Sequence, residues 1–311
     1  MPLWKRRTCL AVVAVIVSAG MAFAQSAQRW DWCNGKNDAS PDLIVSGCTA
    51  VIQSGREDAE DLAVAFYNRG TAFRIKSEFD RAIADYDQSI KLNPKAYDPY
   101  VDRGWAYHLK GDFDRAIENH SEAIKLDSEN ERAFIMRGAA WQRKGDYDRA
   151  IHDNDEAIRI NPKNANAYMT RGNDYREKLD YERALQDYNS ALDLEPDDGV
   201  LFANRCYVHA LAGHHELALK DCNESIRLRP ADNWYALGRR GFAYLLMLQH
   251  EKAIADFDAA LKINPNNSVV LFARGLAKSR LGHQAAGEAD FARAKRMQGN
   301  VAELLAWHGV K

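Results

Sequence analysis

Seven landmark positions recur along the chain at a nearly constant step, and this period constrains the fold more than any other feature. The period is about 34 residues, and only the step from Cys206 to Gly241 is longer, by a single residue. Each landmark directly follows an arginine, and an aspartate or asparagine recurs in step later in each unit. Such a fixed period predicts a stacked array of similar units rather than one globular core. The landmarks are Gly70, Gly104, Gly138, Gly172, Cys206, Gly241 and Gly275.

The residue pattern of one unit, residues 131–164, predicts its secondary structure. Residues 133–144 lack helix breakers and place apolar residues at helical spacing, and Gly-Asp at 145–146 interrupts the pattern. A second amphipathic helix is expected over 147–160, ending before Pro162 because a residue that precedes proline is pushed out of helical geometry. Each unit is therefore a helical hairpin, whose apolar faces its neighbours must cover.

The segments YVDRGWAYHLKGDFDRAIENHSEAIKLD, FIMRGAAWQRKGDYDRAIHDNDEAIRINP and YMTRGNDYREKLDYERALQDYNSALDLEP resemble the tetratricopeptide repeat family. They share its small residue and following aromatic in the first helix, its alanine in the second helix, and in two cases its closing proline. The resemblance implies an all-α fold: a right-handed α-solenoid of stacked helical hairpins, with about seven repeats and capping elements at both ends.

This resemblance divides the chain into four parts. Residues 1–24 are expected to be a signal peptide and 25–62 a divergent N-terminal capping hairpin, with a charged connection over 56–61. Repeats are expected over 63–299, and a C-terminal capping helix over 300–311. The units start near residues 63, 97, 131, 165, 199, 234 and 268.

Residues 1–24 have the pattern of a secretory signal. Residues 5–7 are basic, residues 8–20 are apolar, and residues 22–24 read Ala-Phe-Ala, a small-x-small cleavage signature. Cleavage is expected between Ala24 and Gln25, with an uncleaved anchor as the alternative. We therefore expect a periplasmic or secreted protein.

Without that segment the chain keeps 39 basic and 44 acidic residues, and both signs are interspersed along the helices. No stretch concentrates positive charge, so we expect no nucleic-acid partner and, after signal cleavage, no membrane insertion.

Four cysteines follow the signal segment, an even number that suggests disulfides in an exported chain. Cys33 and Cys48 have nearly the same separation along the chain as Cys206 and Cys222. In each pair the cysteines belong to the two helices of one hairpin, so we predict the disulfides Cys33–Cys48 and Cys206–Cys222.

A metal site is the alternative for the second pair. Cys206 and His209 share one helix face, Cys222 faces them, and histidines follow at 214–215. Zinc accepts such ligands.

The seven recurring arginines face recurring aspartates or asparagines on the second helices. They predict either an anion-binding stripe or structural bridges between carboxylates, and repetition in every unit favours the bridges. The spacing leaves open whether each partner lies in the same or in the adjacent hairpin.

In the resembled family the first helices line a concave surface on which partner peptides lie. Helical spacing alone cannot separate aromatic residues that bind a ligand from those that only pack between helices. A subset of the family clamps a C-terminal carboxylate with basic residues, but the positions of the first basic clamp residue are not basic here. The residues proposed for the partner groove are Tyr67, Arg74, Trp105, Gln142, Asn173, Arg176, Tyr207, Tyr235 and Phe242.

The chain carries no zinc-protease helix, nucleophile elbow, phosphate-binding glycine loop or calcium loop. We therefore expect no enzyme, no catalytic residue and no cofactor. The leading hypothesis is a protein–protein interaction scaffold of the cell envelope that binds a partner peptide or protein in the groove. The alternative is a ligand- or metal-binding envelope protein that uses Cys206, His209 and Cys222.

Overall fold

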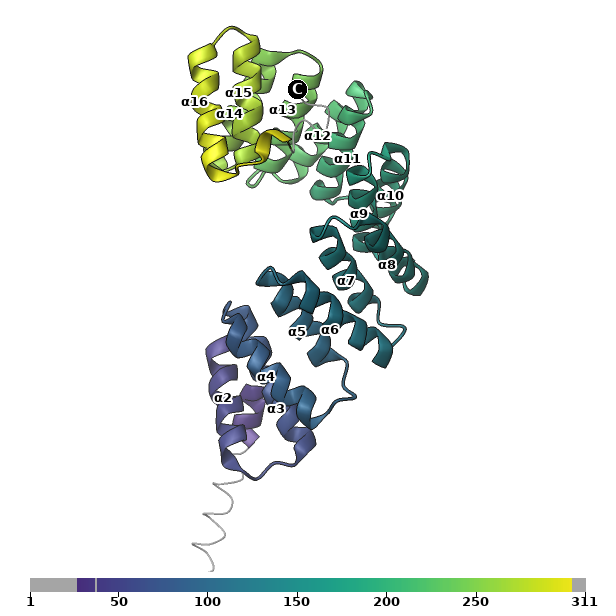
Figure 1. Ribbon diagram of the computed structural model, residues 1–311, viewed down its shortest axis with the longest axis vertical. Coiled ribbons are helices and arrows are strands. Elements are labelled where there is room, and N and C mark those ends of the chain that lie inside the picture. The colour runs from purple at the N-terminus through teal and green to yellow at the C-terminus, as the bar shows by residue number, and fades with distance from the viewer. Residues whose placement is uncertain (1–26, 37, 304–311) are drawn as a thin grey trace, which may run out of the picture. The chain divides into compact units, whose positions relative to one another are not determined.

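The computed structural model describes residues 27–36 and 38–303, and all of the regular structure among them is helical. The predicted signal peptide and its cleavage site lie outside these residues. The helices fall into two compact units, residues 1–144 and 145–311 (Figure 1). None of the described helices is both long and apolar enough to cross a membrane.

In the first unit, residues 27–33 are helical and precede six longer helices. Consecutive helices contact each other, and α3 and α5 also contact the next first helix, α5 and α7 respectively. The helices are α2 (Pro41–Ser54), α3 (Ala59–Ile75), α4 (Phe79–Leu92), α5 (Asp98–Leu109), α6 (Phe113–Leu126) and α7 (Glu131–Arg143).

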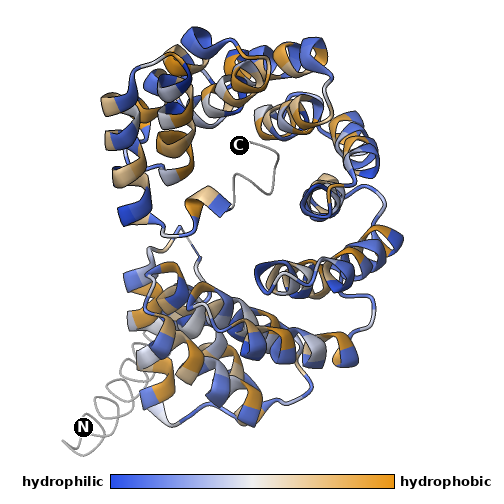
Figure 2. Cartoon of the chain, turned by 45° about the horizontal axis from the view of Figure 1, so that its top comes forward, coloured by the Kyte–Doolittle hydropathy of each residue, from blue (hydrophilic) through white to orange (hydrophobic). Residues whose placement is uncertain are grey.

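In the second unit, consecutive helices again contact each other, and the first helices α9, α11, α13 and α15 contact one another in that order. Most helices carry both apolar and polar residues, as a half-buried helix requires (Figure 2). The helices are α8 (Tyr147–Ile160), α9 (Ala165–Glu177), α10 (Tyr181–Leu194), α11 (Gly199–Leu211), α12 (His215–Leu228), α13 (Trp234–Leu246), α14 (His250–Ile263), α15 (Ser268–Arg280) and α16 (Gln284–Met297).

Polar side chains cap the starts of several helices. Asp112, Asp146 and Asp180 accept a hydrogen bond from a backbone N–H of the helix that each precedes, which satisfies a donor that has no partner within the helix. The turns within hairpins need a left-handed residue, which Gly111 supplies between α5 and α6 at φ 81°. The second helix predicted over 147–160 is confirmed as α8.

The landmark glycines allow the two helices of a hairpin to touch. A Cβ on Gly70 would lie 2.9 Å from the ring of Tyr86, and one on Gly241 would lie 2.7 Å from the ring of Phe257. Both aromatic side chains are fully buried. In these hairpins an aromatic side chain of the second helix therefore fills the space that the missing side chain leaves.

The two ends of the array differ in part from expectation. Residues 59–61 were expected in a charged connection but belong to α3, because Asp58 caps that helix at the backbone N–H of Asp61. At the other end Val301 is fully buried and belongs to the apolar cluster of the second unit. The rest of the expected C-terminal helix, residues 304–311, lies outside the described residues.

Candidate functional site

The recurring arginines bridge polar side chains both within and between hairpins. Arg171 donates to both carboxylate oxygens of Asp187 in its own hairpin, at 2.9 and 2.6 Å, and to Asp155 of the preceding helix at 2.6 Å. Hydrogen bonding to Asp187 raises the pKa of Arg171, although burial opposes this. The same pattern joins Arg69 to Asp85 and Thr49, Arg103 to Asn119 and Asp87, Arg137 to Ser121, Arg205 to Asp221 and Asn189, Arg240 to Asp256 and Asn223, and Arg274 to Asp290 and Asp258.

These contacts decide between the two interpretations of the arginines. Five of the seven arginines bind both oxygens of a buried carboxylate, and Arg103 and Arg137 bind other polar side chains of the same chain. Donors engaged in this way are not available to an external anion. The seven recurring arginines, which we call the ladder arginines, therefore have a structural role. A binding site has to be sought elsewhere on the first helices.

Both predicted disulfides are present. Cys33 pairs with Cys48 at a Cα–Cα distance of 4.5 Å, and Cys206 pairs with Cys222 at 5.4 Å. Cys206 and Cys222 stand where other hairpins place glycine and an aromatic residue, so a covalent bond replaces a packing contact.

The disulfide removes the thiolates that the alternative metal site requires. His209 and His214 do approach each other, with their Nδ1 atoms 3.3 Å apart. Within the described ranges, however, no group of three or more His, Cys, Asp or Glu residues could hold a metal ion.

The structure places the predicted groove residues of the first unit on successive first helices. On α3, Tyr67 donates a hydrogen bond to Asp102 at 2.8 Å, and Arg132 donates to the other oxygen of that carboxylate at 2.5 Å. Asp102 is 2% exposed. We call Tyr67, Asp102 and Arg132 the Asp102 network. Burial and the Asp102 charge raise the pKa of Tyr67.

The other three predicted residues of this unit are not part of that network. Trp105 stacks on His108 with ring centroids 4.8 Å apart. Arg74 has a buried Nε without a hydrogen-bond partner, and Gln142 is half-buried on α7.

In the second unit, the predicted Asn173 and Arg176 hold each other. Asn173 accepts hydrogen bonds from Tyr188 at 2.8 Å and from Arg176 at 3.1 Å. Arg176 also forms an ion pair with Glu177 at 2.6 Å. Arg176 is therefore a neutralised cation.

Tyr207 and Phe242 are core residues in the second unit. They are 3% and 2% exposed, and their rings meet edge to face at 5.8 Å. The packing interpretation therefore holds for Tyr207, whereas Phe242 also borders a pocket.

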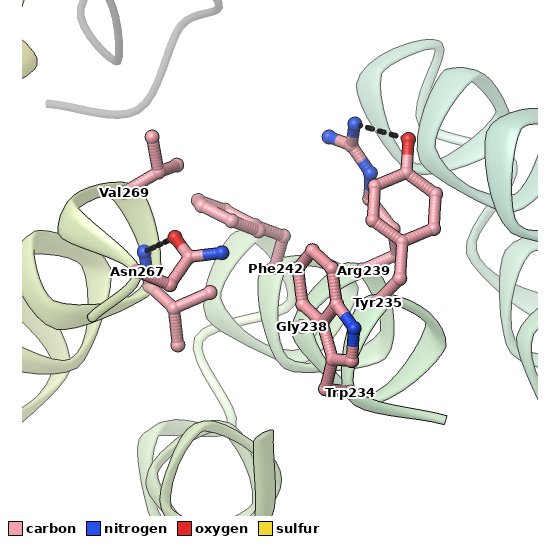
Figure 3. Close-up of a pocket in the computed structure, with 8 residues that line it drawn as sticks. Trp234, Tyr235, Gly238, Arg239, Phe242, Asn267 and Val269 are labelled. Atoms are coloured by element: carbon pink, nitrogen blue, oxygen red, sulfur yellow. Dashed lines mark hydrogen bonds between the residues drawn. The ribbon is translucent and has the colours of Figure 1, made fainter. Parts of the chain in front are cut away.

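That pocket lies between α13 and the start of α15 and has a volume of about 180 Å³. Aromatic side chains of α13 and valines of α15 face it, and Arg239 lies at its edge (Figure 3). Its lining consists of Trp234, Tyr235, Gly238, Arg239, Phe242, Asn267, Val269 and Val270.

A second network fixes the polar edge of the pocket. Tyr235 donates to Asn204 Oδ1 at 2.7 Å and accepts from Arg239 Nη2 at 2.8 Å. The guanidinium carbon of Arg239 lies 3.9 Å from the centroid of the Tyr207 ring, a cation–π contact. We call Asn204, Tyr207, Tyr235 and Arg239 the Arg239 network.

Two arginines act on the phenol of Tyr235 in the Arg239 network. Burial alone would raise the pKa of Tyr235, but Arg239 and Arg176 outweigh it and lower that pKa. A buried phenol whose pKa falls is stabilised in its anionic form by nearby cations and hydrogen-bond donors. An anion would therefore be stabilised at this edge of the pocket.

The sequence pattern did not single out Arg239 and Trp234 as residues of this site. Arg239 stands directly before the ladder arginine of its unit, a position held by asparagine, aspartate, methionine, threonine or alanine in the other units. That departure from the repeat was the available signal.

Comparison with known protein families identifies the repeat. Tetratricopeptide repeat profiles match residues 63–96, 165–198 and 234–267, a second profile of the same description matches 85–118, and a third matches 110–165. Together they cover more than half of the chain. A search of curated protein sequences found no match.

Solved structures share the fold. A tetratricopeptide repeat protein from Parabacteroides merdae superimposes with a TM-score of 0.69 at 19% identity, covering 79% of this chain and 98% of its own. A chain of the APC/C hetero-tetramer Cut9–Hcn1 gives a TM-score of 0.65 at 14% identity, and the match covers 86% of the present chain and 52% of that chain. At these identities the likeness concerns the fold alone.

Proposed function

Because the chain belongs to the tetratricopeptide repeat family, we propose that it is a non-catalytic scaffold of the cell envelope that holds a partner peptide or protein on its first helices. The observation that carries this proposal is the pocket between α13 and α15, which is lined by aromatic and valine side chains and has one cation, Arg239, at its edge. Apolar pockets with a few convergent polar groups are typical of binding sites. Tetratricopeptide repeats commonly serve such interactions.

The composition of the pocket favours binding over catalysis. Its eight described lining residues carry no carboxylate, imidazole, thiol or amine. Those groups, together with the phenol of tyrosine, serve general acid–base and nucleophilic catalysis. The one phenol of the lining, Tyr235, already donates to Asn204 and accepts from Arg239. The lining instead offers rings and one guanidinium, the side chains that dominate protein–protein contacts.

The two disulfides support the envelope location. Both are buried, and each closes a short loop within one hairpin. Disulfides of this kind persist in oxidising compartments. They agree with the export signal expected over residues 1–24.

Site-specific photo-cross-linking in the native cell tests the proposal. A photoreactive amino acid replaces Val269, which lines the pocket, or Leu217, which is 50% exposed and lies outside it. We expect one reproducible protein adduct from position 269 and none from position 217. Equal labelling from both positions, or no adduct from 269, would contradict the proposal. Fractionation of the same cells checks the compartment.

A further inference from the structure

Arg239 differs from the other arginines of its surroundings because it lacks a counterion. It donates to the neutral Tyr235 hydroxyl and stacks on the neutral Tyr207 ring. Among the described residues no aspartate or glutamate pairs with it, and its Nε is buried without a hydrogen-bond partner. A cation held in this way lacks the carboxylate that would complete its hydrogen bonding.

Neighbouring arginines show that the lack of a counterion is particular to Arg239. Arg176 is paired with Glu177, and the adjacent Arg240 binds both oxygens of Asp256 at 2.7 Å. The chain is rich in acidic residues, so counterions are available to most cations of the repeat. Among the described residues that line the pocket, Arg239 is the one arginine, and its guanidinium has no carboxylate partner.

We propose that this pocket recognises an acidic side chain within a partner segment, with Arg239 binding the carboxylate and the apolar pocket receiving a neighbouring hydrophobic side chain. The inference rests on the proposed binding function and names the chemistry of the partner. Guanidinium and carboxylate match in geometry and can form two parallel hydrogen bonds. Trp234, Phe242 and the valines of α15 supply the apolar contact.

The position of Arg239 favours an internal acidic residue over a chain terminus. The first helices α9, α11, α13 and α15 contact one another in order, so the face that they form continues on both sides of α13. A segment bound along this face passes Arg239 rather than ending there. A single guanidinium suffices for one side-chain carboxylate, because Arg176 is already neutralised by Glu177.

Selection from a random peptide library identifies the preferred chemistry even though the partner is unidentified. Dodecamers are displayed as N-terminal fusions, so that none offers a free C-terminal carboxylate. They are selected for binding to the full chain with both disulfides formed. We expect enrichment of Asp or Glu beside an aromatic or aliphatic residue. A parallel library with free C-termini provides the comparison.

The enriched peptide is then synthesised with an amidated C-terminus, together with its Asp→Asn or Glu→Gln counterpart. Fluorescence anisotropy should show that wild type prefers the acidic peptide roughly tenfold, as expected for a hydrogen bond between charged groups. Arg239→Gln should bind both peptides equally. Arg296→Gln removes an exposed arginine on α16 and should behave as wild type.

Each other outcome has a defined meaning. Enriched peptides without an acidic residue that still lose binding with Trp234→Ala would overturn the inference and leave the proposed function standing. Enrichment only of free C-termini would show that the terminal carboxylate is the ligand and would also overturn it. No enrichment from either library would contradict both proposals.

Discussion

In both units, a tyrosine hydroxyl on one first helix donates to the residue that directly precedes the ladder arginine of a neighbouring first helix. In the first unit that residue is Asp102, which also accepts from Arg132. In the second unit it is Asn204, and the partners of Arg239 among the described residues are the Tyr235 hydroxyl and the rings of Tyr207 and Tyr235. An amide in place of a carboxylate thus leaves a cation without a counterion. This difference in charge underlies the proposal that Arg239, unlike Arg132, binds a carboxylate of a partner.

Alanine substitutions at Asp102 and Asn204 should show the largest difference between the two networks, in the free energy of unfolding. Asp102→Ala removes the acceptor of both Tyr67 and Arg132, and we expect it to lower the free energy of unfolding by about 3 kcal/mol. Asn204→Ala removes one neutral hydrogen bond and should cost about 1 kcal/mol. Urea denaturation followed by circular dichroism at pH 7 measures both. Equal losses would show that the two networks do not differ in charge compensation.

Lowering the pH should reduce the folding stability of the first unit because of His120. This side chain is fully buried, and burial, reinforced by the charges of His108, Arg132 and Arg137, lowers its pKa from 6.5 to about 3. The unfolded chain therefore binds a proton below about pH 6.5 that the folded chain does not bind until about pH 3. Stability falls as the pH is lowered through that window, by about 2 kcal/mol at pH 5.

The second unit supplies the control for His120. The corresponding positions there hold Tyr188, Cys222 and Phe257, none of which titrates between pH 3 and 6.5. His120→Phe should therefore flatten the pH dependence of the first unit, as followed by hydrogen exchange of amides in α5 and α6. If wild type and variant lose protection in parallel as the pH falls, His120 is not the cause.

Asn204→Asp should make the Arg239 network resemble the Asp102 network, because it places a carboxylate at the same position. The new carboxylate accepts from Tyr235 and supplies negative charge beside Arg239, so the selected acidic peptide should bind roughly tenfold more weakly. The fold should be unaffected, because the two side chains have the same shape. An unchanged dissociation constant in fluorescence anisotropy would mean that Arg239 does not bind the acidic residue.

The repeat architecture was accessible from the sequence because its signals recur. The period and the second helix at 147–160 both depend on local residue types. The disulfide between Cys206 and Cys222 was predictable for the same reason, since the two cysteines replace a recurring contact pair. The ladder arginines were assigned to structural bridges, and the structure adds that these bridges also join neighbouring hairpins.

The candidate site was less accessible because it depends on departures from the repeat. Tyr207 and Phe242 were named for their aromatic character, yet both are core residues, and periodicity does not report burial. Arg239 was overlooked because its importance lies in a missing partner. Whether a cation is neutralised depends on residues distant in the chain, such as Asn204 or Asp102, which no local pattern connects.

A charge exchange across the interface tests most directly whether the second unit binds an acidic segment through Arg239. The variant Arg239→Glu is titrated with the selected peptide and with a peptide whose acidic residue is replaced by lysine. We expect Arg239→Glu to lose the acidic peptide and to bind the lysine peptide more tightly than wild type does, with the difference shrinking as salt rises from about 50 to about 300 mM. If Arg239→Glu and wild type rank the two peptides in the same order, Arg239 does not recognise the acidic residue.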